Sequence, residues 1–298
     1  MNRRELLKGG LLAGAGLVAG PMLNLGRVRL HGLQPVEVST AAADVVLGTD
    51  VIDMLGLLTL DWPKLFRWHR KPEEFQEADF RHLEMWGTNV VHPAVETSAR
   101  DPYSAAMRWM SGWNHLLSSR TCFLSRIERP ADLERDALQG RIGVMVGFQN
   151  ANHFRTVDDV QAFHALGQRV SQLTYNERNR LGSGCHRQDK GLTPFGAGIV
   201  AEMDRVGMAI DVSHCGERTS QDAIAASKRP VLVTHANCLA LNPRQPRCKS
   251  DEVIRRMAAT GGVMGITMVK SFVGPGRPDV DDLLDHFDHV ARLVGVEH

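Results

Sequence analysis

Two histidines in the C-terminal half of the sequence are placed where they could bind a metal ion. His214 ends the apolar segment "GMAIDVSH" (207–214), and His235 ends the next apolar segment, "PVLVTH" (230–235). Continuously apolar segments of this length are typical of strands in a parallel sheet that is buried on both faces. If the two strands are neighbours, both imidazoles lie at one edge of the sheet and provide half of a metal site. The alternative is a pair of hydrogen-bonded structural histidines.

Apolar segments of this kind alternate with helical patterns along the chain. Besides the two above, they are "DVIDMLGLL" (50–58), "TNVVHPAV" (88–95), "RIGVMVGF" (141–148), "RVSQLTY" (169–175) and "GGVMGITMV" (261–269). The alternation predicts an α/β fold with a parallel sheet, and seven such units predict a (β/α)8 TIM barrel, whose active sites lie at the C-terminal ends of the strands. An open doubly wound sheet is less favoured, because no glycine-rich dinucleotide loop follows the first strand.

The extent of the domain follows from the same count. An amphipathic helix over residues 280–295 follows the seventh strand, and the sequence ends at His298, where an eighth strand would begin. We therefore expect a single barrel domain over residues 45–298, with strand 8 and the rest of its C-terminal part beyond this sequence. Thr156 and Ser250 are the predicted N-caps of two of the connecting helices.

The N-terminus has the pattern of an export signal. The stretch "MNRRELLKGGLLAGAGLVAGPML" places Arg3 and Arg4 before a glycine- and alanine-rich apolar run. This pattern predicts a twin-arginine signal over residues 1–30 and export to the periplasm, although an ordinary basic signal region is an alternative. The run is too short for a membrane span, so none is expected after removal of the signal.

Composition excludes some classes of partner. The 35 basic and 34 acidic residues nearly balance, so the sequence has no nucleic-acid footprint. Five cysteines without a CxxC pattern do not form a disulfide scaffold. Cys215 and Cys238 lie close to the two histidines, where they are either small packing residues or zinc ligands.

Several longer motifs resemble a known family. "QLTYNERNRLGSGCHRQDKGLTPFGAGIVAEMDRVGMAIDVSH", "PVLVTHAN" and "PRQPRCKSDEVIRRMAATGGVMGI" are similar to the membrane dipeptidase (renal dipeptidase) family, peptidase family M19. The resemblance is closest over residues 141–298 and looser over 45–140. It implies a (β/α)8 barrel of the metallo-dependent hydrolase type, with a binuclear zinc centre that hydrolyses small peptides, including dipeptides with a D-residue in second position. A homodimer is compatible with it.

The resemblance also implies roles for individual residues. His214 and His235 take the places of the two histidines on one zinc, and Gln149 takes the place of the glutamate that bridges the metals. Tyr175 stands where the family often has a histidine that steadies the tetrahedral intermediate, and a phenol can also donate a hydrogen bond to an oxyanion. Arg247 takes the place of the arginine that binds the substrate carboxylate.

The sequence departs from the family at the other metal. Asp53 is present, but Leu55 and Leu57 occupy the places of the His-x-Asp ligands, and the amide of Gln149 is a poorer bridging ligand than a carboxylate. The family's catalytic aspartate would follow strand 8, beyond His298. We therefore expect a partly altered site that holds one zinc. The alternative is a metal-depleted family member that binds or tailors a peptide-like ligand without hydrolysing it.

Other polar residues near the predicted strand ends leave two readings open. Asn237 could reach a substrate pocket or cap a helix. Asp211 could orient a metal ligand or be a polar residue of the barrel interior. His286 and His289 are predicted to lie on the solvated face of an outer helix, and His153 receives no functional assignment.

Overall fold

The structure is a computed structural model of the 298-residue chain, and it describes residues 40–85, 87–97, 99–186 and 188–298. The predicted signal, residues 1–30, lies outside the described residues. The described residues divide into two compact units, of which the first contains those up to Pro93 with Ser111–Met145 and the second Ala94–Met110 with Val146–His298. No helix of the described part is both long and apolar enough to cross a bilayer.

The first unit contains a four-stranded parallel sheet. Its strand order is β1 (Ile52–Asp53), β2 (Val90–Val91), β5 (Ile142–Val144) and β4 (Leu124–Arg126). Buried Val90, Ile127 and Leu138 form an apolar cluster against it. The helices named with this unit are α2 (Thr40–Gly48), α3 (Trp62–Arg70), α4 (Glu77–Glu84) and α6 (Arg135–Leu138), and the boundary between the units falls within α5 (Pro102–Ser119).

The second unit contains a six-stranded parallel sheet, and the histidines of interest belong to it. Its strand order is β10 (Met264–Ile266), β9 (Val231–Ala236), β8 (Ala209–Asp211), β7 (Val170–Gln172), β6 (Gly147–Phe148) and β3 (Ala94–Val95). Strands β6 to β10 are consecutive along the chain and adjacent in the sheet, as successive strands of a barrel are.

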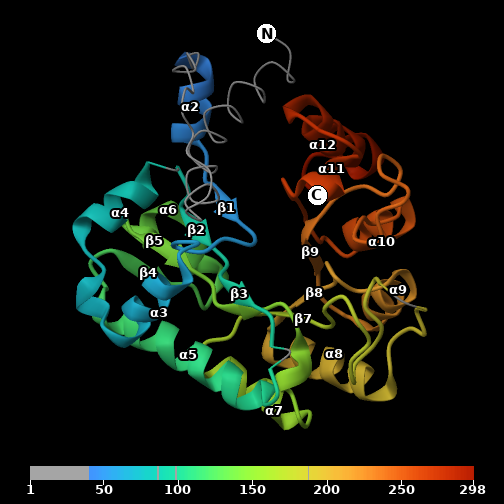
Figure 1. Ribbon diagram of the computed structural model, residues 1–298, viewed down its shortest axis with the longest axis horizontal. Coiled ribbons are helices and arrows are strands. Elements are labelled where there is room, and N and C mark those ends of the chain that lie inside the picture. Colours follow the sequence, from blue (N-terminus) through green and yellow to red (C-terminus); the bar gives the residue numbers. More distant parts are fainter. Residues whose placement is uncertain (1–39, 86, 98, 187) are drawn as a thin grey trace. The chain divides into compact units, whose positions relative to one another are not determined.

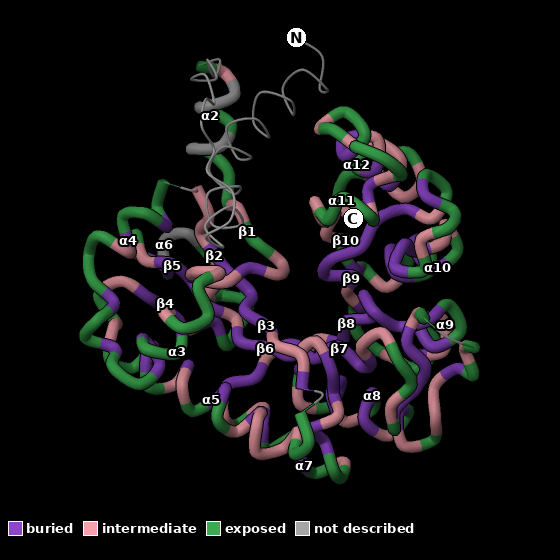
Figure 2. The backbone as a smooth tube through the Cα atoms, viewed as in Figure 1, coloured by how far each residue is buried: buried purple, intermediate pink, exposed green. Residues whose placement is uncertain are grey.

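Helices connect these parallel strands and cover the sheet. They are α7 (Asp158–Ala165), α8 (Pro194–Val206), α9 (Glu217–Ala226) and α10 (Asp251–Ala259), followed by α11 (Lys270–Val273) and α12 (Val280–Val294) after β10. Figure 1 shows α8, α9 and α10 along one side of β7, β8 and β9, and Figure 2 shows that these strands are almost wholly buried. Burial on both faces explains why apolar residues predominate in β8 and β9, whereas β7 also buries Ser171 and Gln172.

The seven predicted strands are confirmed; β9 is as long as its apolar segment and is shifted by one residue, and the other strands are shorter than theirs. The segments 88–95 and 141–148 are each divided into two short strands, and in the first of them Pro93 lies in the gap. Proline has no N–H group to donate to a ladder, so it interrupts regular pairing. The short strand β4 was not predicted. Within the described residues the strands form two open sheets and do not close into a ring.

The predicted N-cap of α10 is confirmed and that of α7 is wrong. The hydroxyl of Ser250 accepts a hydrogen bond from the Val253 N–H at 3.2 Å. Helix α7 begins at Asp158, and its side chain-to-backbone bonds come from Asp159, which accepts from the N–H groups of Arg155 at 2.7 Å and Thr156 at 3.2 Å. The carboxylate thus holds the residues that precede the helix, and no side chain caps the first N–H groups of α7 in the described part of the chain.

His286 does not lie on a solvated face, so that prediction is wrong. Its side chain is fully buried; Nδ1 accepts the Cys238 N–H at 3.0 Å, and Nε2–H donates to the Val273 carbonyl at 2.9 Å. The imidazole thus joins the segment after β9 to the end of α11. His289, one turn on, hydrogen-bonds Asp251 of α10 at 2.8 Å and is partly exposed.

His153 is a buried histidine in an aromatic part of the second unit. Its ring lies 4.4 Å from Phe148, 4.1 Å from Phe154 and 4.7 Å from Phe163, measured between ring centroids. Burial lowers the pKa of His153 to about 4, although hydrogen bonds to Gln168 and Asn150 act in the opposite direction. The side chain is therefore neutral in the folded protein at neutral pH.

This burial predicts a pH-dependent loss of stability. At pH 5 the unfolded chain binds a proton at His153, whereas the folded chain does not, because its pKa is about 4. Stability therefore falls as the pH drops below about 6.5, and His153 alone accounts for about 2 kcal/mol between pH 7 and pH 5. Urea unfolding at both pH values measures it.

The variant His153→Gln should lose about 2 kcal/mol of that pH dependence. Phe154→Leu is the matched control, because it disturbs the same packing without removing a titrating group. If His153→Gln keeps the full pH dependence of the parent protein, the assignment of a neutral buried imidazole is wrong.

Candidate active site

The imidazoles of His214 and His235 meet beyond the ends of two neighbouring strands. Their Nε2 atoms are 2.9 Å apart, and their ring centroids are 5.0 Å apart. His235 lies within β9, one residue from its end, whereas His214 lies three residues beyond the last residue of β8, Asp211. The predicted meeting of the two rings is confirmed, but the prediction that His214 ends its strand is wrong: it is carried by the turn that follows.

The tautomer of His214 is fixed by a neighbouring amide. Nδ1 of His214 lies 2.6 Å from Oδ1 of Asn176, an atom that can only accept a hydrogen bond. The Sγ–H of Cys185 also points to this oxygen, at 3.7 Å. Nδ1 therefore carries the proton, and Nε2 of the neutral ring has its lone pair directed at His235.

The tautomer of His235 is fixed by a chain of two hydrogen bonds. The hydroxyl of Thr234 donates its single proton to Oδ2 of Asp211 at 2.8 Å, so its oxygen accepts from Nδ1–H of His235 at 2.8 Å. Asp211 also accepts from the N–H groups of Ser213 at 2.9 Å and Thr234 at 3.1 Å. Nε2 of His235 therefore also presents a lone pair, and Asp211 acts on it through Thr234.

Two lone pairs that face each other across 2.9 Å repel unless a cation lies against both. A proton is disfavoured in this place: burial lowers the pKa of His214, and the positive charges of Arg247 and Lys249 lower it further, together with His235. A metal ion is the other cation that accepts two imidazole lone pairs. The two residues therefore fit as two ligands of such an ion, with their Nδ1–H groups oriented by acceptors as is usual for metal-bound histidines.

The described residues supply no complete metal cage. Among them, no group of three or more His, Cys, Asp or Glu side chains could hold a metal ion. Cys215 and Cys238 are buried free thiols; Sγ of Cys215 accepts from the Thr174 hydroxyl, and Sγ of Cys238 donates to the His286 carbonyl. Packing, the first of the two readings of these cysteines, is what the structure shows.

Tyr175 stacks on His214. The ring centroids are 4.1 Å apart and the planes are inclined by 20°. Burial raises the pKa of the Tyr175 phenol, and the negative charge of Glu96 raises it further, against an opposing effect of Arg247. The phenol therefore keeps its proton at neutral pH and can donate it in a hydrogen bond beside the histidine pair.

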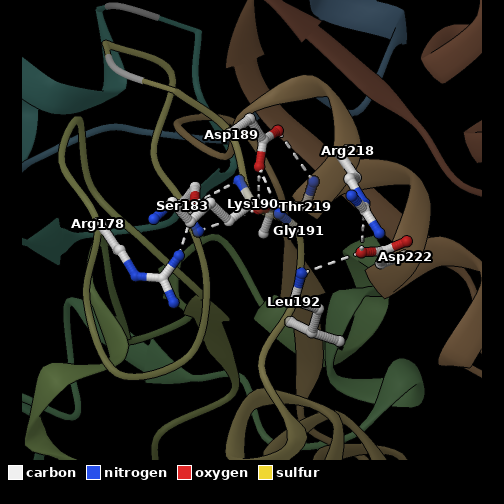
Figure 3. A network of polar contacts seen from close by, with 9 residues as sticks. All are labelled: Arg178, Ser183, Asp189, Lys190, Gly191, Leu192, Arg218, Thr219 and Asp222. Atoms are coloured by element: carbon white, nitrogen blue, oxygen red, sulfur yellow. Dashed lines mark hydrogen bonds and ion pairs between the residues drawn. The ribbon is translucent and has the colours of Figure 1, made fainter.

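The loop after β7, which carries the residues that contact His214, is held on the first turns of α9. Figure 3 shows that the Asp189 carboxylate accepts from the Thr219 N–H at 3.1 Å, the Thr219 hydroxyl at 2.8 Å and the Gly191 N–H at 2.9 Å. Asp222 of α9 accepts from the Leu192 N–H at 3.0 Å. These bonds fix the irregular loop after β7, which carries the Tyr175 ring that stacks on His214.

Arg247 joins the two segments that carry the histidines. Its Nη1 donates to the Ser213 carbonyl, and its Nη2 donates to the His235 carbonyl at 2.9 Å. The side chain is only 2% exposed, its guanidinium lies 5.0 Å from the centre of the Phe272 ring, and its Nε has no hydrogen-bond partner among the described residues. Donors of the guanidinium that do not bind these carbonyls are available to a ligand.

Lys249 fixes the turn on which His214 lies. Nζ donates to the carbonyls of Val212 at 2.6 Å and Cys215 at 2.8 Å, and to the Ser220 hydroxyl at 3.2 Å. Burial lowers the pKa of Lys249 to about 8. A buried ammonium whose three protons are all bonded holds the turn from both sides of the histidine.

The remaining predicted site residues are placed less directly. The side-chain amide of Gln149, just after β6, donates to the Ala94 carbonyl at 3.2 Å, and no contact of that side chain with either histidine is found among the described residues. Asn237 is fully buried directly after β9, and neither atom of its side-chain amide has a partner in the described part of the chain. Asp53 lies on β1, in the first unit.

Sequence reasoning missed three residues that position the pair: Asn176, Thr234 and Lys249. Thr234 precedes His235 and faces Asp211 across neighbouring strands, a relation that parallel pairing of the two segments could have suggested. Asn176 and Lys249 lie on irregular loops, whose paths the apolar pattern does not describe.

With this geometry in view, comparison with known proteins identifies the family. Residues 85–298 match the model of the membrane dipeptidase family, peptidase family M19. The chain belongs to this family. A solved amidohydrolase from Pseudomonas aeruginosa is 32% identical, with a TM-score of 0.71 over 85% of this chain and 73% of that one. A metallo peptidase from Rhodobacter sphaeroides, solved with a phosphinate mimic of the dipeptide L-Ala-D-Ala, has a TM-score of 0.69 at 20% identity, over 83% of each chain.

These similarities show the fold class of the chain, and the similar curated proteins are dipeptidases. The chain is an α/β protein of the (β/α)8 barrel class, of which the described strands form two open parallel sheets. Dipeptidase verJ of Clonostachys rogersoniana is 31% identical over 163 residues, and dipeptidase C965.12 of Schizosaccharomyces pombe is 29% identical over 168 residues. Each match covers 53% of this chain and spans about two fifths of the relative, 42% and 40% respectively.

The bonds of Lys249 predict that the histidine-bearing turn depends on this side chain. Lys249→Met preserves most of its volume but removes the charged donor from the carbonyls of Val212 and Cys215, which keep only the Cys215 N–H at 3.0 Å and the Ser220 hydroxyl at 3.5 Å, respectively. We expect the free energy of unfolding to fall by about 2 kcal/mol, since each hydrogen bond to a charged group contributes about 1.5–3 kcal/mol and removing a buried charge offsets part of the loss.

Lys228→Met, at an exposed position, is the control and should change stability by less than about 0.5 kcal/mol. Chemical unfolding of the two variants beside the parent measures both effects. Equal stability of Lys249→Met and the parent would show that the turn is held without the lysine.

Proposed function

We propose that the protein is a zinc-dependent dipeptidase that hydrolyses small peptides, including dipeptides with a D-residue in second position, in the periplasm after twin-arginine export. The proposal is supported by membership of peptidase family M19. The observation that carries it is the approach of the two Nε2 atoms to 2.9 Å, with Nδ1 of each ring bonded to an oxygen, from which we infer that both Nε2 atoms present lone pairs. This arrangement suits a divalent cation and suits little else.

His214 and His235 are the residues that would hold the zinc. A bound zinc polarises the scissile carbonyl and lowers the pKa of water to about 7. The chain's own residues orient the groups around it: Asp211 and Thr234 fix the ring of His235, and Asn176 fixes that of His214. A catalytic zinc generally has three protein ligands.

Tyr175 and Arg247 have roles that follow from their surroundings. The protonated phenol of Tyr175, stacked on His214, donates a hydrogen bond to the oxygen on which negative charge develops during hydrolysis. Arg247 binds the carboxylate of the peptide with donors that its two carbonyl bonds leave over, while those bonds keep the guanidinium in place. Asn237 and Gln149, near the same strand ends, are proposed to contact substrate and metal respectively.

A second candidate is a non-hydrolytic protein of the same family that binds a peptide-like ligand. Two observations favour it: no third metal ligand joins the histidine pair among the described residues, and the amide of Gln149 is bonded to a main-chain carbonyl. The barrel, Arg247 and the site would then serve binding alone.

Zinc content separates the two candidates. Elemental analysis of the dialysed protein should find one zinc per chain, and His214→Ala with His235→Ala should remove it, because two of the ligands are lost. Thr234→Val should weaken zinc binding by about 10–100-fold, since the oriented Nδ1–H of His235 loses its acceptor.

His289→Gln is the control for zinc binding, because it removes an imidazole on α12 that bonds Asp251. Its zinc content should equal that of the parent. Zinc that survives loss of both His214 and His235, or folded parent protein without metal, contradicts the proposal.

Activity tests the role of the phenol. A panel of dipeptides with L- and D-residues in second position should yield free amino acids with the zinc-loaded protein. Tyr175→Phe should lower kcat by about 100-fold with little change in KM, because an oxyanion donor acts in the transition state.

Tyr103→Phe is a matched control, since Tyr103 is the other tyrosine of the chain. It lies on α5, and its ring stacks against the guanidinium of Arg155. This variant should leave kcat unchanged. Binding of dipeptides without release of amino acids would favour the non-hydrolytic candidate.

A further inference from the structure

A second feature of the C-terminal half is a basic pocket beside the segment that carries Arg247. It has a volume of about 420 Å³ and lies between residues 242–245, in the loop after β9, and residues 270–276, around α11. A volume of this size suits one side chain or a small ligand. We call this hollow the Arg244–Lys270 pocket, after its two cationic residues.

In the described part of the chain, the pocket is lined by two positively charged side chains and by no acidic side chain. Arg244 and Lys270 line it, no acidic residue does, and neither cation has an ion-pair partner among the described residues. The other walls are polar or small, including Asn242, Gln245 and Gly276. Like charges that line a concave surface raise the local concentration of anions.

Hydrogen bonds fix the two walls relative to each other. The amide of Asn242 donates to the carbonyls of Ser271 at 3.0 Å and Phe272 at 3.2 Å, and that of Gln245 donates to Ser271 at 2.9 Å. Buried His286 also joins the start of the loop after β9 to α11, through the Cys238 N–H and the Val273 carbonyl. The space between the cations is thus held open before any ligand arrives, which lowers the entropic cost of binding.

The pocket is connected to the candidate active site through Gln245 and Phe272. Oε1 of Gln245 accepts the Arg247 N–H at 3.2 Å, while Nε2 of Gln245 donates to the Ser271 carbonyl on the opposite wall. The ring of Phe272 lies 5.0 Å from the Arg247 guanidinium. These contacts join both walls of the pocket to Arg247, the residue proposed to bind the terminal carboxylate of a peptide.

We propose that the Arg244–Lys270 pocket binds a carboxylate on the second residue of the substrate, so that the site selects acidic dipeptides. This inference rests on the proposed dipeptidase function, because it takes Arg247 as the ligand of the terminal carboxylate. Two cations of opposite walls flank the pocket, and a carboxylate bonded to cationic donors is bound more strongly than a neutral amide of the same shape.

The test compares Ala-Glu with Ala-Gln, which differ by a charge and hardly in shape, and repeats the comparison with Ala-D-Glu and Ala-D-Gln. Calorimetric titration gives Kd for each, and kinetics with the zinc-loaded protein gives KM. At low ionic strength we expect at least one acidic peptide to bind about 5–10-fold more tightly than its neutral partner. Arg244→Gln and Lys270→Gln together should reduce that preference to within about twofold.

Arg277→Gln is the matched control, since it removes one positive charge next to Gly276 without touching the lining of the pocket. It should keep the preference for the acidic peptide. Inorganic phosphate, titrated alone, distinguishes the other source of an anion: phosphate binding that depends on Arg244 and Lys270, without discrimination between the peptides, would overturn the proposal for a substrate carboxylate.

Equal affinity for acidic and neutral peptides in the parent protein would also overturn it. Failure of the proposed function has a different signature, because calorimetry detects the preference even where no peptide is hydrolysed. A preference that persists in the double variant would place the selecting charge elsewhere and so contradict the pocket.

Discussion

The site depends on one enforced contact, the approach of two imidazole lone pairs to 2.9 Å. Each ring could relieve this repulsion by moving its proton to Nε2, but Nδ1 of His214 is bonded to an amide oxygen, and Nδ1 of His235 is bonded to a hydroxyl whose own proton goes to Asp211. Asn176 fixes one tautomer, and the chain from Asp211 through Thr234 fixes the other. The fold thus holds two lone pairs close together after β8 and at the end of β9, and this arrangement favours the binding of a cation.

Two buried cations, Arg247 and Lys249, oppose a proton between the two imidazoles. Arg247 bonds the main chain at Ser213 and His235, and Lys249 bonds it at Val212 and Cys215. They hold the histidines in place through the backbone, and their charges oppose protonation of His214. A metal ion bound here has to outweigh the same two positive charges through its bonds to the imidazole nitrogens.

The strands and the meeting of the histidines could be predicted from the sequence because burial on both faces leaves an apolar pattern. The chain order of β6 to β10 follows from the alternation with helices. Other features left no such pattern. His214 lies past its strand in a turn held by Lys249, and His286 points inward from a helix that was predicted to present it to solvent. Such positions are decided by single hydrogen bonds between segments distant in sequence, which local periodicity does not record.

The central claim concerns proton positions, which nitrogen NMR measures directly. Long-range ¹H–¹⁵N spectra of histidine-labelled, metal-free protein report which nitrogen of each ring carries hydrogen. The account predicts protonated Nδ1 and unprotonated Nε2 in both His214 and His235 at neutral pH, and a joint shift of both Nε2 signals on addition of one equivalent of zinc. A proton on Nε2 of either ring, or zinc that shifts neither signal, would contradict it.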